Sequence, residues 1–304
     1  MSVPVALTVA GSDPSGGAGV QADLKTFSAL GAYGTAVLTA LTAQNTRGVT
    51  GVHLVPADFV TQQLETLVAD VRVDAVKIGM LATAELADAV AAFLRRHPSD
   101  VVVLDPVMVA TSGDRLLADD AVAALRRMLP LASLVTPNLP EAGHLLGVEQ
   151  ARDVPAMREQ ALRLLDTGAA RVLLKGGHLD GDAVDVLAGP DGVQELRAPR
   201  VPTANTHGTG CSLSSAIAAL RVQRPGWQEA IADAKAWLTG ALAAADTLAV
   251  GGGHGPVHHF HALWPPRSPD GRPPDDRASD DRASDDRASE GRPHRTSGAR
   301  PGSG

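Results

Sequence analysis

The sequence predicts an α/β protein with a mostly parallel central sheet that helices cover on both faces. The main observation is that short apolar, β-branched segments alternate with helix-patterned segments along most of the chain. In addition, Asp74–Ile78 and Val101–Leu104 have the composition of strands buried on both faces, as parallel strands are. The 304 residues, 44% of them hydrophobic, suffice for one sizeable core, and with 3% aromatics that core must consist of Ala, Val and Leu. Ligands on such sheets bind at the carboxyl ends of the strands.

The first third of the chain supplies the clearest alternation. Its first helix places Val20, Leu24, Phe27 and Leu30 on one face. The elements expected here are, in order, a strand at Pro4–Ala10, a helix at Gly17–Leu30, strands at Ala36–Thr42 and Val49–Val55, a helix at Ala57–Val71, a strand at Asp74–Ile78, a helix at Ala84–Arg96 and a strand at Val101–Leu104.

The rest of the chain continues the alternation and adds a hairpin. Pro190–Gly192 is a turn between two β-patterned segments, which favours an antiparallel pair. The elements expected here are strands at Ser133–Thr136 and Arg171–Lys175 with a helix at Pro155–Thr167 between them, hairpin strands at Asp182–Ala188 and Gly192–Ala198, and helices at Thr209–Val222 and Trp227–Leu242.

Composition excludes several classes of protein. The net charge of −7 without a basic block argues against a nucleic-acid partner. The single cysteine, Cys211, rules out a disulfide within the chain and fits a reducing cytoplasm. Met1–Ala10 lacks the cationic region of a secretory signal, and no apolar segment approaches the roughly 20 residues of a membrane span. We therefore expect a cytoplasmic protein without membrane contact.

The composition changes abruptly near Pro265. The sequence Asp-Asp-Arg-Ala-Ser occurs three times in tandem, and residues 265–304 contain almost no large apolar side chain. Such a segment cannot offset the entropy lost on ordering. We expect one folded domain over residues 1–264 and a disordered tail over residues 265–304.

A glycine-rich segment, Gly11–Gly19, directly follows the first expected strand. Gly17–Ala22 matches the dinucleotide pattern G-x-G-x-x-A, but the glycines lie too far beyond the strand and no acidic residue ends the next strand to hold a ribose. A dehydrogenase is therefore disfavoured, and the chain has no P-loop motif. Small and polar residues between strand and helix favour a ligand site over a flexible connection.

A second motif, Asn205–Cys211, begins a long expected helix. Gly208, Thr209 and Gly210 leave the backbone N–H groups of the first turn accessible at the positive end of the helix dipole, which suits a transferring phosphoryl group. The same field lowers a thiol pKa, so we expect Cys211 to be partly thiolate rather than an inert buried residue.

These two motifs belong to a longer series that resembles the hydroxymethylpyrimidine/phosphomethylpyrimidine kinases, a ribokinase-like branch with an α/β/α fold. The resemblance covers Val5 to about Leu263. The matching segments are Ala10–Asp13, Gly16–Gly19, Gln21–Phe27, Thr39–Thr46, Val76–Leu81, Leu104–Met108, Thr136–Ala142, Leu174–His178 and Asn205–Cys211. The resemblance implies phosphorylation of a pyrimidine alcohol and then of its monophosphate in thiamine synthesis.

For the pyrimidine, the resemblance implies that Asp23 and Gln44 bind the ring. An amide such as Gln44 can pair with both a 4-amino group and the adjacent ring nitrogen. Gly11, Met80 and Val107 match positions that line the same pocket, although core packing would explain Met80 and Val107 equally well. A flat heterocycle fits apolar walls around few polar groups.

For the phosphates, the resemblance implies ATP and Mg²⁺ as cofactors. Asn138 and Glu141 match an N-x-x-E motif that holds Mg²⁺ largely through water; as an alternative, they begin a helix with Glu141 favourable to its dipole. Lys175 ends a strand and suits nucleotide phosphates. Asp105 also ends a strand and could assist metal or phosphate, or simply form a turn before a proline.

Sugar kinases of the superfamily have an aspartate, as general base, at the position of Cys211. Our hypothesis is that the thiol suffices because a phosphate monoester is already anionic and needs no base, whereas an alcohol loses a proton. Replacing Cys211 by alanine should then impair the alcohol step more than the monophosphate step.

Other interpretations remain open. A pyridoxal kinase on the same fold would act on a similar ring, and a non-catalytic pyrimidine-binding protein would need no Mg²⁺. His178 and His207 lie near the motifs without an assigned role. Dimers are common for this fold, so a homodimer is one expectation. Four histidines near the end of the domain could form a metal cluster, but their segment resembles the family's C-terminal region instead; they are His254, His258, His259 and His261.

Overall fold

The computed structural model describes residues 2–108, 120–177, 179 and 181–265. His178 and nearly all of the predicted tail, with its Asp-Asp-Arg-Ala-Ser repeats, lie outside these described residues. The chain divides into two units, Met1–Leu263 and Trp264–Gly304, so the first unit holds every element described below. None of the helices in the described ranges is long and apolar enough to cross a membrane.

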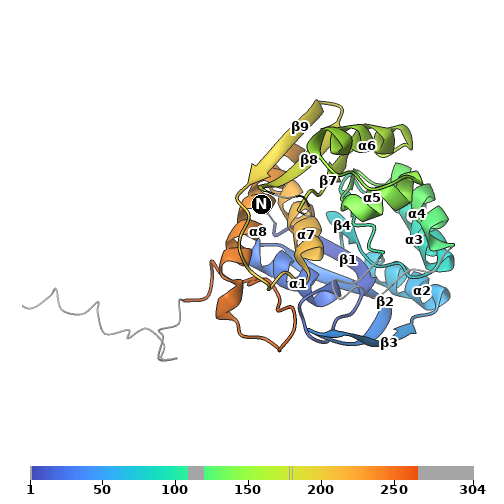
Figure 1. Cartoon of the computed structure of the whole chain (residues 1–304). Coiled ribbons are helices and arrows are strands. Elements are labelled where there is room, and N and C mark those ends of the chain that lie inside the picture. The colour runs from blue at the N-terminus through green and yellow to red at the C-terminus, as the bar shows by residue number, and fades with distance from the viewer. Residues whose placement is uncertain (1, 109–119, 178, 180, 266–304) are drawn as a thin grey trace, which may run out of the picture. The chain divides into compact units, whose positions relative to one another are not determined.

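The centre of the first unit is a large sheet (Figure 1). Within the described residues it has nine strands in the order β3-β2-β1-β4-β5-β6-β7-β8-β9. In this order the six strands β2, β1, β4, β5, β6 and β7 run parallel to one another, whereas β3, β8 and β9 pair antiparallel with their neighbours. The strands are β1 (Val5–Gly11), β2 (Tyr33–Asn45), β3 (Gly48–Leu54), β4 (Ala75–Ile78), β5 (Val102–Leu104), β6 (Leu134–Val135), β7 (Val172–Leu174), β8 (Ala183–Gly189) and β9 (Gly192–Ala198).

Helices cover both faces of this sheet, so the fold has three layers (Figure 1). One face packs against α1 (Gly19–Ala29), α7 (Thr209–Arg221) and α8 (Trp227–Ala243). The other face packs against α2 (Ala57–Val68), α3 (Ala84–Arg96), α4 (Ala121–Met128), α5 (Leu139–Leu146) and α6 (Val154–Asp166). Two short 3-10 helices complete the unit, η1 (Leu129–Leu131) and η2 (Ala245–Thr247).

The predicted fold class is confirmed, and so is the hairpin, because β8 and β9 pair antiparallel across Gly189 and Gly192. The predicted apolar face of α1 also packs inward: Val20 and Phe27 are buried, and Leu24 and Leu30 pack against the same cluster. The core consists largely of Ala, Val and Leu, as the scarcity of aromatics required.

Two helices, α4 and α5, are absent from the elements expected above. Both have eight residues, fewer than an isolated helix needs for stability, so tertiary packing has to stabilise them. Helix α5 confirms the alternative reading of Asn138 as a helix start, since Asn138 is its N-cap. The strand β2 extends beyond its expected end at Thr42, because the residues up to Asn45, including Gln44, pair with β3.

Candidate active site

A cavity of about 1020 Å³ opens where the parallel strands β1, β4, β5 and β7 end. This is the edge at which ligands bind on α/β sheets. The predicted site residues that line the cavity are Gly11, Gln44, Met80, Val107, Asn138, Glu141, Lys175, Gly208, Thr209, Gly210 and Cys211.

The N-terminus of α7 forms one wall of the cavity. Its N-cap, Gly208, has a φ of 76° and no side chain caps the helix. A Cβ on Gly208 would lie 1.8 Å from the carbonyl oxygen of Gly17, so only glycine fits between the two loops. The hydroxyl of Thr209 donates to the carbonyl of Thr206 at 2.6 Å, which turns it away from the helix N–H groups. Thr209 N–H also donates to the Thr206 carbonyl at 3.2 Å, so the first turn offers the N–H groups of Gly210 and Cys211 to an anion.

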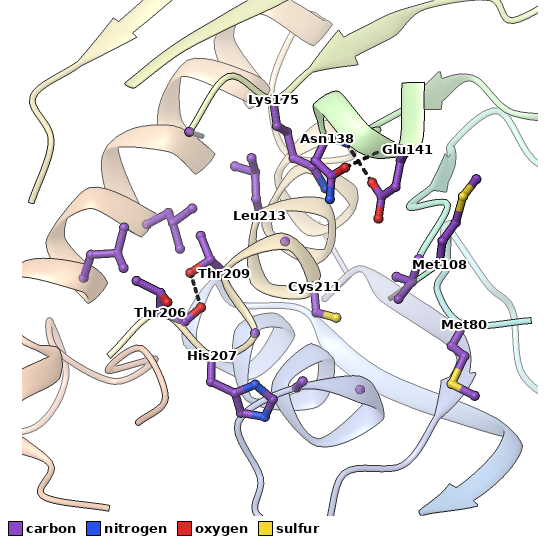
Figure 2. A pocket seen from close by; sticks show the side chains of 18 of the residues that line it. Met80, Met108, Asn138, Glu141, Lys175, Thr206, His207, Thr209, Cys211 and Leu213 are labelled. Atoms are coloured by element: carbon purple, nitrogen blue, oxygen red, sulfur yellow. Dashed lines mark hydrogen bonds between the residues drawn. The ribbon is translucent and has the colours of Figure 1, made fainter. Parts of the chain in front are cut away.

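Lys175 follows β7 and lies over this helix end. A Cβ on Gly210 would lie 3.3 Å from Lys175 Nζ, so the ammonium group sits close to the first turn of α7 (Figure 2). Asp105 accepts a hydrogen bond from Lys175 Nζ at 2.8 Å. Burial alone would lower the pKa of Lys175, but Asp105 and Glu141 raise it, so the side chain carries its positive charge to the cavity.

Asn138 and Glu141 face Lys175 from the start of α5 (Figure 2). They form a capping box: Glu141 N–H donates to Asn138 Oδ1 at 2.9 Å, and Asn138 N–H donates to Glu141 Oε2 at 2.7 Å. Burial raises the pKa of the Glu141 carboxyl to about 7, although Lys175 acts in the opposite direction. Added positive charge at this wall would therefore favour the ionised carboxylate.

These side chains can be tested against the implied Mg²⁺. In the described parts of the chain, no group of three or more His, Cys, Asp or Glu side chains could hold a metal directly. Mg²⁺ usually keeps several waters and binds one or two carboxylates together with substrate phosphates. The capping box uses Asn138 Oδ1 and Glu141 Oε2 once each, and each oxygen keeps a further lone pair for a water molecule, so the residues fit Mg²⁺ held through water.

Cys211 is the third residue of α7 and points its sulfur into the cavity toward the side of Met80 and Met108 (Figure 2). The expectation of a partly ionised thiol is wrong. Burial raises the pKa of Cys211 to about 11, and the charges of Asp23 and Asp105 add to this effect, whereas Lys77 opposes it. The cost of desolvating a thiolate here exceeds the stabilisation expected from the helix dipole, so the thiol is neutral at pH 7.

The opposite end of the cavity has apolar walls. Met80 packs with Ala40, Ala82 and Val107 in a small cluster. Gly11 contributes only backbone to this wall, and an added Cβ there would lie 3.2 Å from Met80 Sδ. Gln44 lies at the end of β2, with its Oε1 atom 3.2 Å from the Thr42 hydroxyl. This end offers a mostly apolar slot with one amide.

Asp23 does not line the cavity, contrary to the role implied for it. It is fully buried, and protein groups occupy both carboxylate oxygens. Lys77 Nζ lies 2.8 Å from each oxygen, Thr8 donates to one at 2.6 Å and Ser215 to the other at 2.7 Å. Asp23 therefore joins β1, β4, α1 and α7 behind the site rather than facing a ligand.

Asp105 likewise lies behind the wall, 1% exposed, and does not line the cavity. Besides Lys175, the hydroxyls of Thr136 and Ser214 lie 3.3 Å from its carboxylate oxygens. Its contact with any phosphate or metal would thus pass through Lys175.

Several polar residues at the cavity had no role assigned from the sequence, among them Lys77, Asp13 and His207. Burial alone would lower the pKa of Lys77, but Asp23 outweighs this effect and raises it, so a fixed positive charge stands beneath the cavity. A lysine inside an otherwise apolar strand was the available signal for Lys77. Asp13 and His207 lie within the two glycine-rich motifs, but the sequence does not show that they contact each other.

Two histidines near the end of the domain have hydrogen-bond partners in the described residues. His259 Nε2 lies 3.0 Å from the Ser212 hydroxyl, and burial lowers the pKa of His259 to about 3. His254 pairs with the carbonyl of Ala204. No metal-binding group of His, Cys, Asp or Glu occurs where the chain is described, so the interpretation of these histidines as a metal cluster gains no support.

Comparison with known proteins places this site in context. The ADP complex of Bacillus subtilis pyridoxal kinase matches with a TM-score of 0.80 and 36% identity, over 87% of this chain and 100% of that one. Clostridium difficile phosphomethylpyrimidine kinase matches with a TM-score of 0.70 and 40% identity, over 79% of this chain and 99% of that one. The fold and the cavity at its strand ends thus define a ribokinase-like small-molecule kinase.

Sequence relatives narrow this class. The model of the phosphomethylpyrimidine kinase family matches residues 13–258. The hydroxymethylpyrimidine/phosphomethylpyrimidine kinase of Escherichia coli is 58% identical over 261 residues, 85% of this chain and 98% of the relative. That of Rhizobium meliloti is 54% identical over 262 residues, 86% of this chain and 98% of the relative. The chain belongs to the phosphomethylpyrimidine kinase family.

Proposed function

We propose that the protein transfers the γ-phosphoryl group of ATP to 4-amino-5-hydroxymethyl-2-methylpyrimidine, and then to the resulting monophosphate, in thiamine biosynthesis. The observation that carries this proposal is the division of one cavity into two ends. An apolar slot with the Gln44 amide lies at one end, and the cationic N-terminus of α7 with Lys175 lies at the other. Relatives with the corresponding two-substrate name are up to 58% identical.

The apolar slot supports an aminopyrimidine as acceptor. The walls of Met80 and Val107 suit a planar ring, and Gln44 can both donate and accept hydrogen bonds at its polar edge. Asp23 has no part in this recognition, because its carboxylate is fully used by protein groups.

The cationic end supports phosphoryl transfer. The N–H groups of α7 and the Lys175 ammonium would bind the transferring group and stabilise the charge that its oxygens carry in the transition state. Glu141 and Asn138 are the residues that would hold Mg²⁺ through water, and the bound ion would supply neutralisation of phosphate charge. Asp105 keeps Lys175 in place through its 2.8 Å ion pair.

The two reaction steps place different demands on Cys211. In the first, the hydroxymethyl oxygen bonds to the γ-phosphorus, the bond to ADP breaks and the hydroxyl proton must leave. In the second, the attacking oxygen belongs to a phosphate and is already anionic. A neutral thiol can accept no proton, so only its minor ionised form could act as a base in the first step.

A second acceptor, pyridoxal, is favoured by one observation. The pyridoxal kinase of Bacillus subtilis has a higher TM-score with this chain, 0.80, than the Clostridium difficile phosphomethylpyrimidine kinase, 0.70. Its lower sequence identity, 36% against 40%, points the other way, so we propose pyridoxal only as a slower acceptor. We also propose that the enzyme works in the cytoplasm, where ATP and Mg²⁺ are available.

The proposal is tested by replacing Gln44 with alanine. Loss of its hydrogen bonds should raise the KM for both pyrimidines by about 10- to 100-fold, while the KM for ATP changes little. Steady-state assays of ADP release measure both constants. Absence of turnover by the unmodified protein would remove the proposed function, whereas an unchanged pyrimidine KM in Gln44→Ala would remove only the role of Gln44.

A further inference from the structure

Asp13 and His207, 194 positions apart in the sequence, form a buried pair at the cavity. His207 Nε2 lies 2.7 Å from Asp13 Oδ2, and the side chains are 7% and 2% exposed. Burial alone would raise the pKa of Asp13, but hydrogen bonds from His207, Ser15 and Ala18 outweigh it and lower the pKa. Because the ionised carboxylate only accepts hydrogen bonds, Nε2 must carry the hydrogen of this pair.

The same carboxylate organises the loop between β1 and α1. Asp13 Oδ2 also accepts from the backbone N–H of Ala18 at 2.8 Å and of Gly17 at 3.2 Å. Asp13 Oδ1 accepts from the backbone and hydroxyl of Ser15 at 2.9 and 2.7 Å. This loop continues directly from Gly11, so Asp13 links the acceptor slot to His207.

His207 directly precedes the N-cap of α7. The loop that contains it packs closely against the loop between β1 and α1, with glycines at the contact. A Cβ on Gly17 would lie 2.3 Å from His207 Cδ2, and one on Gly208 would lie 1.8 Å from the Gly17 carbonyl. His207 N–H also donates to the Gly255 carbonyl at 3.0 Å. The hydrogen bond between Asp13 and His207 is thus a direct side-chain link between the acceptor-side loop and the helix end that faces the phosphates.

We propose that Asp13 and His207 are positioning residues that hold the first turn of α7 in register with the acceptor. The inference rests on the proposed kinase function and deepens it. A displacement of about 1 Å between two reacting groups can lower a rate by about 100-fold even when each ligand still binds. Removing the link should therefore lower kcat on both pyrimidines and leave the affinities for ATP and pyrimidine nearly unchanged.

Two variants of His207 separate positioning from imidazole chemistry. In His207→Gln the amide nitrogen reaches about as far as Nε2 and can still donate to Asp13, whereas in His207→Asn it cannot. We expect His207→Asn to lose about 10- to 100-fold in kcat and His207→Gln to stay within about threefold of the unmodified enzyme. Calorimetric titration with a non-hydrolysable ATP analogue and with the pyrimidine should give dissociation constants within about threefold for all three proteins.

A double-variant cycle tests whether the two side chains act as one unit. Asp13→Ala combined with His207→Asn should lose no more kcat than the worse single variant, because either change already breaks the link. If Asp13→Ala does not fold, as urea unfolding would show, the Asn and Gln variants of His207 still decide the question.

A matched control comes from another histidine–carboxylate pair. His97 Nε2 lies 2.9 Å from Glu65 Oε2, joining the C-cap of α3 to α2 on the opposite face of the sheet. His97→Asn should leave kcat unchanged. Equal losses in the Asn and Gln variants of His207, or full kcat in a folded His207→Asn, would overturn the proposal. Inactivity of the unmodified protein would instead refute the proposed function.

Discussion

The neutral thiol of Cys211 makes a specific prediction about pH. With a pKa of about 11, only a minute fraction of the thiol is ionised at pH 7, and this fraction grows about tenfold with each pH unit below the pKa. If the thiolate removes the hydroxyl proton, kcat/KM for the pyrimidine alcohol should rise steeply between pH 7 and 9. The monophosphate reaction should not, because its nucleophile is already ionised.

Rate profiles of both reactions measure this difference, with the monophosphate as internal control. Cys211→Ala should remove the slope of the alcohol reaction and leave that of the monophosphate reaction unchanged. Parallel profiles for the two substrates, or equal losses on both in Cys211→Ala, would show that Cys211 does not act as a base.

The buried ion pair of Lys77 and Asp23 predicts a large effect on stability. Both side chains are inaccessible to solvent, so Lys77→Met would leave a carboxylate buried without its counter-charge. Breaking such a pair costs about 3–5 kcal/mol of unfolding free energy. Arg127→Met, which breaks the exposed pair with Asp88, should cost less than about 1 kcal/mol.

Urea unfolding of the two variants provides the comparison. Similar small losses for Lys77→Met and Arg127→Met would mean that Asp23 is readily solvated or protonated. In that case its exclusion from ligand binding would need to be reconsidered.

Most of the residues that the sequence predicted for the site line the cavity, but the sequence could not tell which charged groups face the ligand. Asp23 and Asp105 match family positions, yet their carboxylates are occupied by partners from distant elements. Cys211 was predicted to be partly ionised because the helix dipole is visible in the sequence, whereas the burial that dominates its pKa is not. The contact between Asp13 and His207 exists only in the folded structure, so the sequence could not show it.

The start of α7 depends on glycine at position 208. A side chain there would require both a positive φ of 76° and space within 1.8 Å of the Gly17 carbonyl. Gly208→Ala should therefore lower the free energy of unfolding by more than about 2 kcal/mol and lower kcat. Gly181, with a φ of 82° and no atom within 4 Å of an added Cβ, is a matched control for backbone strain alone.

Thermal and urea unfolding of the two alanine variants separate these contributions. Gly181→Ala should cost about 1 kcal/mol. Equal losses in the two variants would show that the loop around Gly17 yields to the new side chain, and that the close contact does not fix α7.

Secondary structure was predictable where an element carries its own pattern. The buried strands and the helices α1, α3 and α7 were expected close to their observed positions. The short helices α4 and α5 were not, because packing rather than local periodicity stabilises them. The α5 capping box also shows that one motif, Asn138 with Glu141, can begin a helix and present oxygens to a cavity.

The whole first unit places the two ends of one cavity along the carboxyl edge of the sheet. The alternation of strands and helices predicted this edge, since parallel strands end together. The walls of the cavity come from α5, α7 and the β2–β3 hairpin, and the alternation did not predict how these elements face one another.

The most direct test of this account is the release of ADP by the purified protein with MgATP and three acceptors. These are 4-amino-5-hydroxymethyl-2-methylpyrimidine, its monophosphate and pyridoxal, at matched concentrations. The account predicts turnover of both pyrimidines and much slower turnover of pyridoxal. Turnover of pyridoxal with neither pyrimidine accepted would contradict it, and would leave only the fold and the phosphate end of the cavity in place.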